Sequence, residues 1–304
     1  MKKLQPKGVI PPVITPFKAD GEVNFGAYER NMERWEKENL GGYVVLGSNG
    51  EFPYLGEEEK LELVKLTVDG SKKRLPVFAG TGMESARETI KLTNKAAALG
   101  ADAGLILTPN YFSSIMDQTK SFIAYFTEVA NNSDIPIYLY NVPKFSKVNM
   151  SVEAVTALAT HPNIHGMKDS TGDAPQLKSF KDAVPADWNM MTGTAITWLD
   201  ALKMGIKACI IAPANCYPQA AVDVMNAFNA GDISLAEELN VKSLALNKLT
   251  SSAYGMPGLK VACDLLGFEG GHVRNPLLDL TEEETAKYKA ELIEFFGKNF
   301  GLTF

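Results

Sequence analysis

Lys168 is the residue of this chain with the clearest chemical potential. It directly follows the apolar run from Ile164 to Met167, as a side chain at the end of a buried strand would. A lysine in that place loses hydration, which favours the neutral amine, and a neutral amine attacks a carbonyl carbon to form a Schiff base. Position alone leaves an alternative, a surface lysine whose stem lies on apolar neighbours while its ammonium reaches water.

Three hydroxyl groups stand where they would assist an imine-forming lysine. Tyr140 ends the apolar run that precedes the Lys168 run, so its phenol is expected beside the amine and suited to proton transfer. A phenol needs activation for this role, and we expect a proton relay through Ser48 and Tyr111. Ordinary packing is the alternative for an isolated tyrosine.

A turn at Gly47 to Gly50 has two glycines that bracket Ser48 and Asn49. Glycines allow backbone N–H groups to approach an anion closely, so the turn is suited to a carboxylate. A simple chain reversal is the alternative, and Glu51 is expected to be structural. Because the net charge of −6 repels an anionic substrate, we expect capture by local donors rather than long-range attraction.

The chain that must position these residues alternates apolar, β-rich runs with segments of helical periodicity. This alternation is typical of βα units around a parallel sheet. Eight runs with no G-x-G-x-x-G after the first favour a closed (β/α)8 TIM barrel over an open doubly wound sheet. The predicted strands are Val9–Ile14, Tyr43–Leu46, Val77–Ala79, Gly104–Leu107, Ile135–Tyr140, Ile164–Lys168, Asn189–Thr192 and Ala208–Ala212.

Helix boundary signals complete the predicted organisation. Asn24 is expected to cap a first helix that ends at Gly41, and helices are expected at Ser85–Leu99 and Ala195–Met204. From Tyr217 onward the pattern predicts helices only, with capping boxes at Ser234/Glu237 and Thr281/Glu284. We therefore expect a barrel over residues 1–216 that carries the active site, and a C-terminal helical extension over residues 217–304.

Composition excludes several classes of function. The sequence has no run of eighteen apolar residues and no apolar signal segment, so we expect a soluble, unexported protein with no membrane contact. Three cysteines without CxxC spacing favour a reducing, cytoplasmic compartment, and three scattered histidines predict no metal site. The net charge of −6 argues against nucleic-acid binding.

In a barrel of this kind the active site forms where the strands end, and the sequence there carries distinctive segments. They are VITPF, GSNGE, AGTG, TPNYF, YNVP and GMKDSTGD, in this order along the chain. With them, nearly the whole chain resembles the dihydrodipicolinate synthase and N-acetylneuraminate lyase superfamily. The resemblance favours a catalytic Lys168 over a surface lysine.

The resemblance also implies residue roles. Lys168 of GMKDS would form the Schiff base with pyruvate, Tyr140 of YNVP would transfer protons, and Ser48 with Asn49 would bind the pyruvyl carboxylate. Tyr111 would complete a relay from a neighbouring subunit, in a homo-oligomer that is commonly a tetramer. Ser170 is a substrate-side candidate, Gly193 and Ile210 would border the site, and no cofactor is expected.

Within the superfamily, four segments are most similar to 4-hydroxy-2-oxoglutarate aldolase: GSNGEFPYL, HPNIHGMKDSTGD, YGMPGLK and the GG-x-x-R-x-P pattern at 270–276. A class I aldolase that cleaves or forms such a 2-oxo acid is therefore the first expectation, and a 2-keto-3-deoxy sugar acid aldolase is closely related.

Three other functions remain as alternatives. Dihydrodipicolinate synthase (4-hydroxy-tetrahydrodipicolinate synthase), which condenses pyruvate with aspartate semialdehyde, usually carries an arginine where this chain has Phe145. The Lys144–Lys147 loop does not match the small, polar loop expected of an aldolase either. A noncatalytic oxo-acid-binding barrel is remote, and a nicotinamide oxidoreductase is disfavoured by the missing glycine fingerprint.

Overall fold

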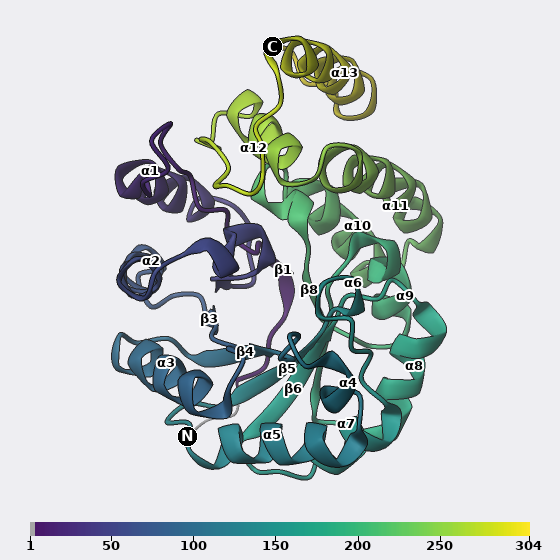
Figure 1. Cartoon of the computed structure of the whole chain (residues 1–304). Helices are drawn as coiled ribbons and strands as arrows, with labels where there is room; N and C mark the ends of the chain where they lie inside the picture. The colour runs from purple at the N-terminus through teal and green to yellow at the C-terminus, as the bar shows by residue number, and fades with distance from the viewer. Residues whose placement is uncertain (1–3) are drawn as a thin grey trace.

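The computed structural model describes residues 4–304 and shows eight parallel strands arranged as a barrel (Figure 1). The strands pair in the order β1-β8-β7-β6-β5-β4-β3-β2, and a parallel bridge between Pro12 and Val44 joins the two edges. The fold is therefore the predicted (β/α)8 TIM barrel. Its strands are β1 (Gly8–Ile10), β2 (Tyr43–Val45), β3 (Val77–Gly80), β4 (Ala103–Leu107), β5 (Ile137–Asn141), β6 (Ile164–Asp169), β7 (Asn189–Thr192) and β8 (Ala208–Ile210).

Each predicted apolar run overlaps one strand. The first strand ends four residues earlier than predicted, because Pro11 and Pro12 follow Ile10 and neither proline has an N–H to donate to a ladder. Apolar residues continue to Ile14, where the backbone N–H binds the Asn215 side chain instead.

Helices cover the outside of the barrel (Figure 1). The elements between strands are α1 (Phe25–Trp35), η1 (Ser48–Gly50), η2 (Phe52–Tyr54), α2 (Glu57–Gly70), α3 (Ala86–Ala98), α4 (Ser113–Met116), α5 (Thr119–Asn131), α6 (Pro143–Ser146), α7 (Val152–Leu158), α8 (Ala174–Ala183), η3 (Ala195–Thr197) and α9 (Trp198–Lys203). After β8 come η4 (Ala212–Asn215), α10 (Gln219–Asn229), α11 (Ile233–Asn247), the π-helical η5 (Lys248–Ala253), α12 (Gly255–Leu265) and α13 (Glu282–Phe300).

Two of the predicted helix boundaries are wrong. Helix α1 ends at Trp35 rather than near Gly41, which instead lies so close to the first strand that a Cβ there would overlap the Lys7 carbonyl. Helix α11 is capped by Asp232, whose carboxylate accepts from the Leu235 N–H, because that carboxylate is an equally good cap two residues before Ser234. The capping box at Thr281 and the cap at Asn24 are confirmed.

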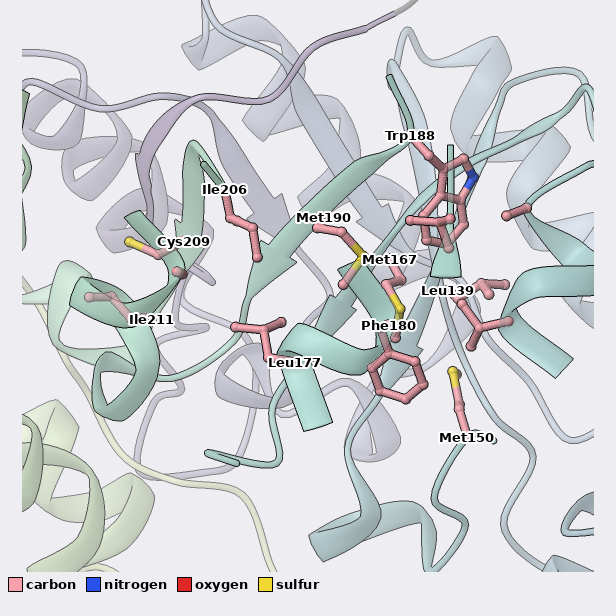
Figure 2. Packing of buried hydrophobic residues seen from close by; sticks show 14 of the residues in the cluster. Leu139, Met150, Met167, Leu177, Phe180, Trp188, Met190, Ile206, Cys209 and Ile211 are labelled. Carbon is pink, nitrogen blue, oxygen red and sulfur yellow. The ribbon is translucent and has the colours of Figure 1, made fainter. Parts of the chain in front are cut away.

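Alternation along the strands separates two cores. On β6, Met167 lies in the cluster between strands and helices, where Figure 2 shows it near Met190, Leu139 and Phe180. Its neighbour Lys168 points to the opposite face, toward the inside of the barrel. Mostly apolar side chains fill that inner face, including Phe78, Leu105, Tyr138, Met191 and Ile210. Lys168 therefore lies at the end of a hydrophobic barrel interior.

Candidate active site

Lys168 and Tyr140 are directly paired on neighbouring strands. The register of β5 and β6 places Tyr140 opposite Lys168, and the Lys168 Nζ atom lies 4.2 Å from the centroid of the Tyr140 ring. Both residues are buried, with 4% and 6% of their surface exposed. The predicted neighbourhood of amine and phenol is present.

The surroundings of Tyr140 favour its ionised form. Burial raises the pKa of Tyr140, but the Lys168 charge and hydrogen bonds with Ser48, Ser170 and Lys168 outweigh it, and the net pKa is below the ordinary tyrosine value. The Ser48 Oγ atom lies 3.4 Å from the phenol oxygen. A phenol whose pKa is lowered is suited to giving and taking a proton beside the amine.

Gly193, directly after β7, provides the space for the lysine side chain. A Cβ atom added there would overlap Ser170 Oγ and lie 2.7 Å from Lys168 Cε. The Ser170 hydroxyl donates to the Gly193 carbonyl at 3.4 Å, and the Gly193 N–H donates to the Asp169 carbonyl. A side chain at position 193 would therefore overlap Ser170 and crowd the end of the Lys168 side chain.

The turn after β2 forms the opposite wall. Residues Ser48–Gly50 form the 3₁₀ turn η1, which is flanked by Leu46 and Glu51 with positive φ angles of 58° and 55°. Non-glycine residues rarely adopt this left-handed conformation, and such strain is held only where the surroundings fix it. The Asn49 Nδ2 atom lies 3.2 Å from the Met256 sulfur of α12.

Two adjoining cavities open over these residues. One, of about 590 Å³, is lined by seven of the eight predicted site residues: Ser48, Asn49, Tyr140, Lys168, Ser170, Gly193 and Ile210. The other, of about 360 Å³, shares Ser48 and Tyr140 but is mostly apolar, with Leu107, Phe145 and Leu277 among its walls. The strand ends thus surround two neighbouring cavities, one that contains the polar candidate residues and one that is mostly apolar.

Tyr111 is the predicted site residue that lies elsewhere in this chain. Its side chain is 79% exposed, packs edge-on against Phe112, and lines neither cavity. The Glu84 carboxylate accepts hydrogen bonds from the backbone N–H groups of Asn110 and Tyr111, which fixes the loop. Its role through a neighbouring subunit stays a prediction.

A hydrogen-bonded cluster of polar side chains surrounds Asp169, the residue that follows Lys168 on β6. The sequence analysis did not predict this cluster. The Asp169 carboxylate accepts from Asn141 Nδ2 at 2.8 Å and from the Thr171 hydroxyl at 2.6 Å. Burial raises the pKa of Asp169, although the hydrogen bonds from Thr171 and Asn141 oppose the shift. The sequence signal for this cluster was present in the strand-end segments YNVP and KDST.

The C-terminal helices also contribute to the cavity, a contribution that sequence reasoning missed. Side chains from the end of α11, from η5 and from α12 line the space above Lys168: Asn247, Ser251, Ser252 and Met256. No local pattern identifies them, because they lie about eighty residues beyond Lys168 and are positioned only by the packing of α11 and α12.

Comparisons with known proteins agree with this geometry. The model of the dihydrodipicolinate synthetase family matches residues 5–294. The chain belongs to this family. A 4-hydroxy-tetrahydrodipicolinate synthase of Rhizobium meliloti is 36% identical over 92% of this chain and 95% of its own length.

Two solved structures from the same family superpose closely. A dihydrodipicolinate synthase of Bacillus anthracis has a TM-score of 0.90, 28% identity, and coverage of 95% of this chain and 98% of its own. YagE, a prophage protein of E. coli K12 solved with pyruvate, has a TM-score of 0.88 at 30% identity with the same coverage. The family consists of class I pyruvate-dependent lyases, so this chain is an enzyme of that class.

Two negative findings accompany these matches. No helix within residues 4–304 is long and apolar enough to cross a membrane. The same residues contain no group of three or more His, Cys, Asp or Glu side chains that could hold a metal ion.

Proposed function

We propose that Lys168 of this chain forms a Schiff base with pyruvate and that the resulting enamine makes or breaks a carbon–carbon bond with an aldehyde. The observation that carries the proposal is the buried pair of Lys168 and Tyr140, with Nζ 4.2 Å from the ring centroid, at the mouth of the barrel. The neutral amine attacks C2, and water leaves as the imine forms.

Tyr140 would move the protons in these steps. Its phenol donates to the departing hydroxyl and receives a proton back through Ser48, whose Oγ lies 3.4 Å away. Loss of a C3 proton from the iminium gives the enamine, which attacks the aldehyde carbon; the reverse sequence cleaves the C3–C4 bond. Ser48 and Asn49 would hold the pyruvyl carboxylate at the η1 turn.

The names of the relatives favour aspartate semialdehyde as the aldehyde. The curated relatives at 34–36% identity are 4-hydroxy-tetrahydrodipicolinate synthases, and they support this alternative better than the aldolase predicted first. We therefore place condensation of pyruvate with aspartate semialdehyde first among the candidate activities.

One observation favours a second candidate. Phe145 occupies the position of the arginine that would receive the carboxylate of aspartate semialdehyde, and no arginine is among the described residues that line the two cavities. Lys144 lines both cavities, but an ammonium does not provide the two-pronged recognition of a guanidinium. An aldolase acting on 4-hydroxy-2-oxoglutarate or a 2-keto-3-deoxy sugar acid keeps the pyruvate half-site and does not need that arginine.

Two assays on the purified enzyme separate the candidates. One follows pyruvate consumption with aspartate semialdehyde, and the other follows pyruvate release from 4-hydroxy-2-oxoglutarate or a 2-keto-3-deoxy sugar acid. A synthase turns over the first mixture and an aldolase the second. Turnover in neither, by folded protein, would leave the noncatalytic oxo-acid-binding barrel and contradict the proposal.

The Phe145→Arg variant refines the assignment. If the acceptor is a second carboxylate, the new guanidinium should improve kcat/KM for aspartate semialdehyde by about tenfold, the value of one charge-assisted hydrogen bond. The matched control is Val241→Arg, which adds an arginine at an exposed apolar residue of α11, a helix other than α6, and should leave kcat/KM unchanged.

We further propose a cytoplasmic homo-oligomer of four subunits, in keeping with the family pattern, that needs no cofactor and binds neither membrane nor nucleic acid. The exposed Tyr111 side chain supports assembly, since it lies outside the cavities of its own subunit.

A further inference from the structure

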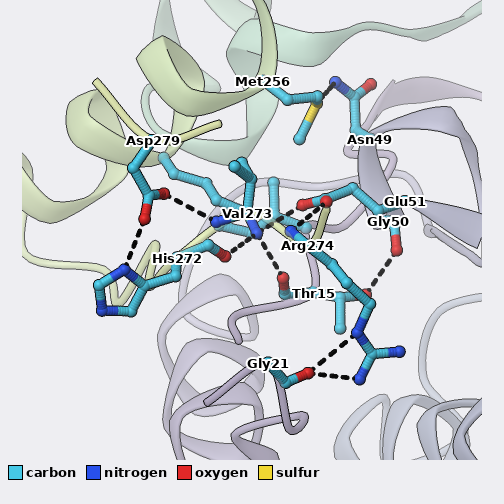
Figure 3. A network of polar contacts seen from close by, with 12 residues as sticks. Thr15, Gly21, Asn49, Gly50, Glu51, Met256, His272, Val273, Arg274 and Asp279 are labelled. Carbon is cyan, nitrogen blue, oxygen red and sulfur yellow. Dashed lines mark hydrogen bonds and ion pairs between the residues drawn. The ribbon is translucent and has the colours of Figure 1, made fainter. Parts of the chain in front are cut away.

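Helix α12 contacts the η1 turn at two points that lie one helical turn apart. Met256 and Lys260 are separated by four residues, so their side chains project from the same face of α12. The Met256 sulfur meets the Asn49 amide at 3.2 Å, and Lys260 Nζ meets a Glu51 carboxylate oxygen at 2.5 Å. Figure 3 shows Met256, Asn49, Gly50 and Glu51 in this arrangement.

Lys260 is buried and binds groups on both the η1 turn and its neighbouring segments. Its side chain is 1% exposed, and the ammonium donates to the Thr15 carbonyl at 2.8 Å and the His272 carbonyl at 2.5 Å besides pairing with Glu51. The Phe17 ring lies 4.6 Å from Nζ. Burial lowers the pKa of Lys260, and the Glu51 carboxylate opposes this shift.

Glu51 and Thr15 connect the Lys260 ammonium to the η1 turn. The second Glu51 oxygen accepts from the Arg274 backbone N–H at 3.0 Å, and Glu51 itself holds the left-handed backbone that ends η1. Thr15 donates its hydroxyl to the Gly50 carbonyl at 2.8 Å while its own carbonyl accepts from Lys260. The end of η1 is thereby fixed through the Glu51 side chain and through the Gly50 backbone carbonyl.

We propose that Lys260 is a positioning residue of the active site, which through Glu51 and Thr15 holds the Ser48–Gly50 turn in the geometry that binds the substrate carboxylate. The inference rests on the proposed function, which assigns that carboxylate to Ser48 and Asn49. A buried ion pair contributes little net stability but has few allowed geometries, so its main effect here is to fix a strained turn.

This role predicts a selective defect. Without the ion pair to Lys260, Glu51 is free to leave the left-handed conformation, and Ser48 and Asn49 lose the geometry that the proposed function assigns to them. Binding of a carboxylate suffers, whereas the attack of Lys168 on a carbonyl does not, because Lys168 lies on β6 and is not among the groups that Lys260 binds.

The test compares borohydride trapping of pyruvate with trapping of pyruvamide, in which an uncharged amide replaces the carboxylate. The variants are Lys260→Met and the double variant Glu51→Gln/Lys260→Met. The double variant leaves no unpaired buried charge and keeps an acceptor for the Arg274 N–H, so it answers the question if the single variant fails to fold. The control is Lys203→Met/Glu237→Gln, which removes an exposed pair at 2.9 Å.

The expected result is a pyruvate trapping rate about tenfold lower in the double variant, with a pyruvamide rate changed less than about twofold and the control unaltered. An unchanged ratio of the two rates, or an equal fall in both, overturns the positioning role while the proposed function stands. Absence of trapping by the wild-type enzyme withdraws the proposed function together with this inference.

Discussion

The ammonium of Lys168 and the phenol of Tyr140 are neighbours because two parallel strands pair in register. Each side chain is the last inward-pointing residue of its strand, and the barrel interior behind both is filled by a buried hydrophobic cluster. In such a place a charge interacts strongly with its partner, and the partner's protonation responds. The lowered pKa of Tyr140 expresses this coupling.

Tyr140→Phe tests the proton-transfer role at the scale of one oxygen atom. The variant keeps the ring beside Lys168 and removes only the hydroxyl, so we expect kcat to fall by about 10² to 10⁴-fold with a smaller change in KM for pyruvate. Steady-state kinetics measure both values. A kcat within about threefold of wild type would show that water, not the phenol, carries the proton.

The same hydroxyl governs the alkaline side of the pH profile. Because the pKa of Tyr140 is below the ordinary value of 10.0, the protonated phenol is lost at a lower pH than for an ordinary tyrosine. Steps that need the phenol as acid therefore slow as the pH rises through this lowered pKa. This alkaline limb of kcat should be absent from the residual activity of Tyr140→Phe.

Among the elements, the loops after β6 and β7 meet at one glycine. Gly193→Ala should leave the barrel folded but push aside Ser170 and the end of the Lys168 side chain, and a misplacement of about 1 Å costs roughly 10²-fold in rate. Borohydride trapping and thermal unfolding measure the two effects. Gly297→Ala in α13, where the nearest atom is 3.5 Å away, is the control and should be silent.

The elements also show what a sequence can and cannot predict. All eight strands were located because strands buried on both faces are continuous apolar runs. The strand ends then gave Lys168 and Tyr140 as candidates, and the family resemblance, rather than position alone, favoured a catalytic Lys168. The end of α1 was misplaced because no glycine terminates it, and the Asp232 cap was missed because Ser234 fits the capping-box pattern.

The sequence also did not predict that Met256 and Lys260 contact the η1 turn and its flank. Their partners Asn49 and Glu51 lie more than two hundred residues earlier, and such contacts leave no local signal.

At the scale of the whole molecule, the described chain forms a barrel with α11, α12 and α13 packed beside it at one side (Figure 1). These helices share a core with β2, α1 and the residues Val13 and Ile14 that follow β1, so the C-terminal helices support the strand that leads into the η1 turn. A division at residue 216 remains a prediction, because the helices beyond it both complete the outer layer and line the cavity.

Assembly is testable by complementation. If Tyr111 acts in a neighbouring subunit, Tyr111→Phe and Lys168→Ala homo-oligomers should both be nearly inactive, while mixed oligomers should regain activity because some sites combine an intact Lys168 with an intact Tyr111. Turnover after mixing, unfolding and joint refolding measures this. Mixed oligomers no more active than the parents would show that Tyr111 does not act between subunits.

The most direct test of the account is borohydride reduction of the enzyme with pyruvate, followed by intact mass measurement and peptide mapping. Reduction converts an imine into a stable secondary amine, so the account predicts one pyruvyl adduct per subunit, on Lys168, and none in Lys168→Ala. Folded wild-type protein that gains no adduct, or an adduct mapped to another lysine, would contradict the assignment of Lys168 as the Schiff-base residue.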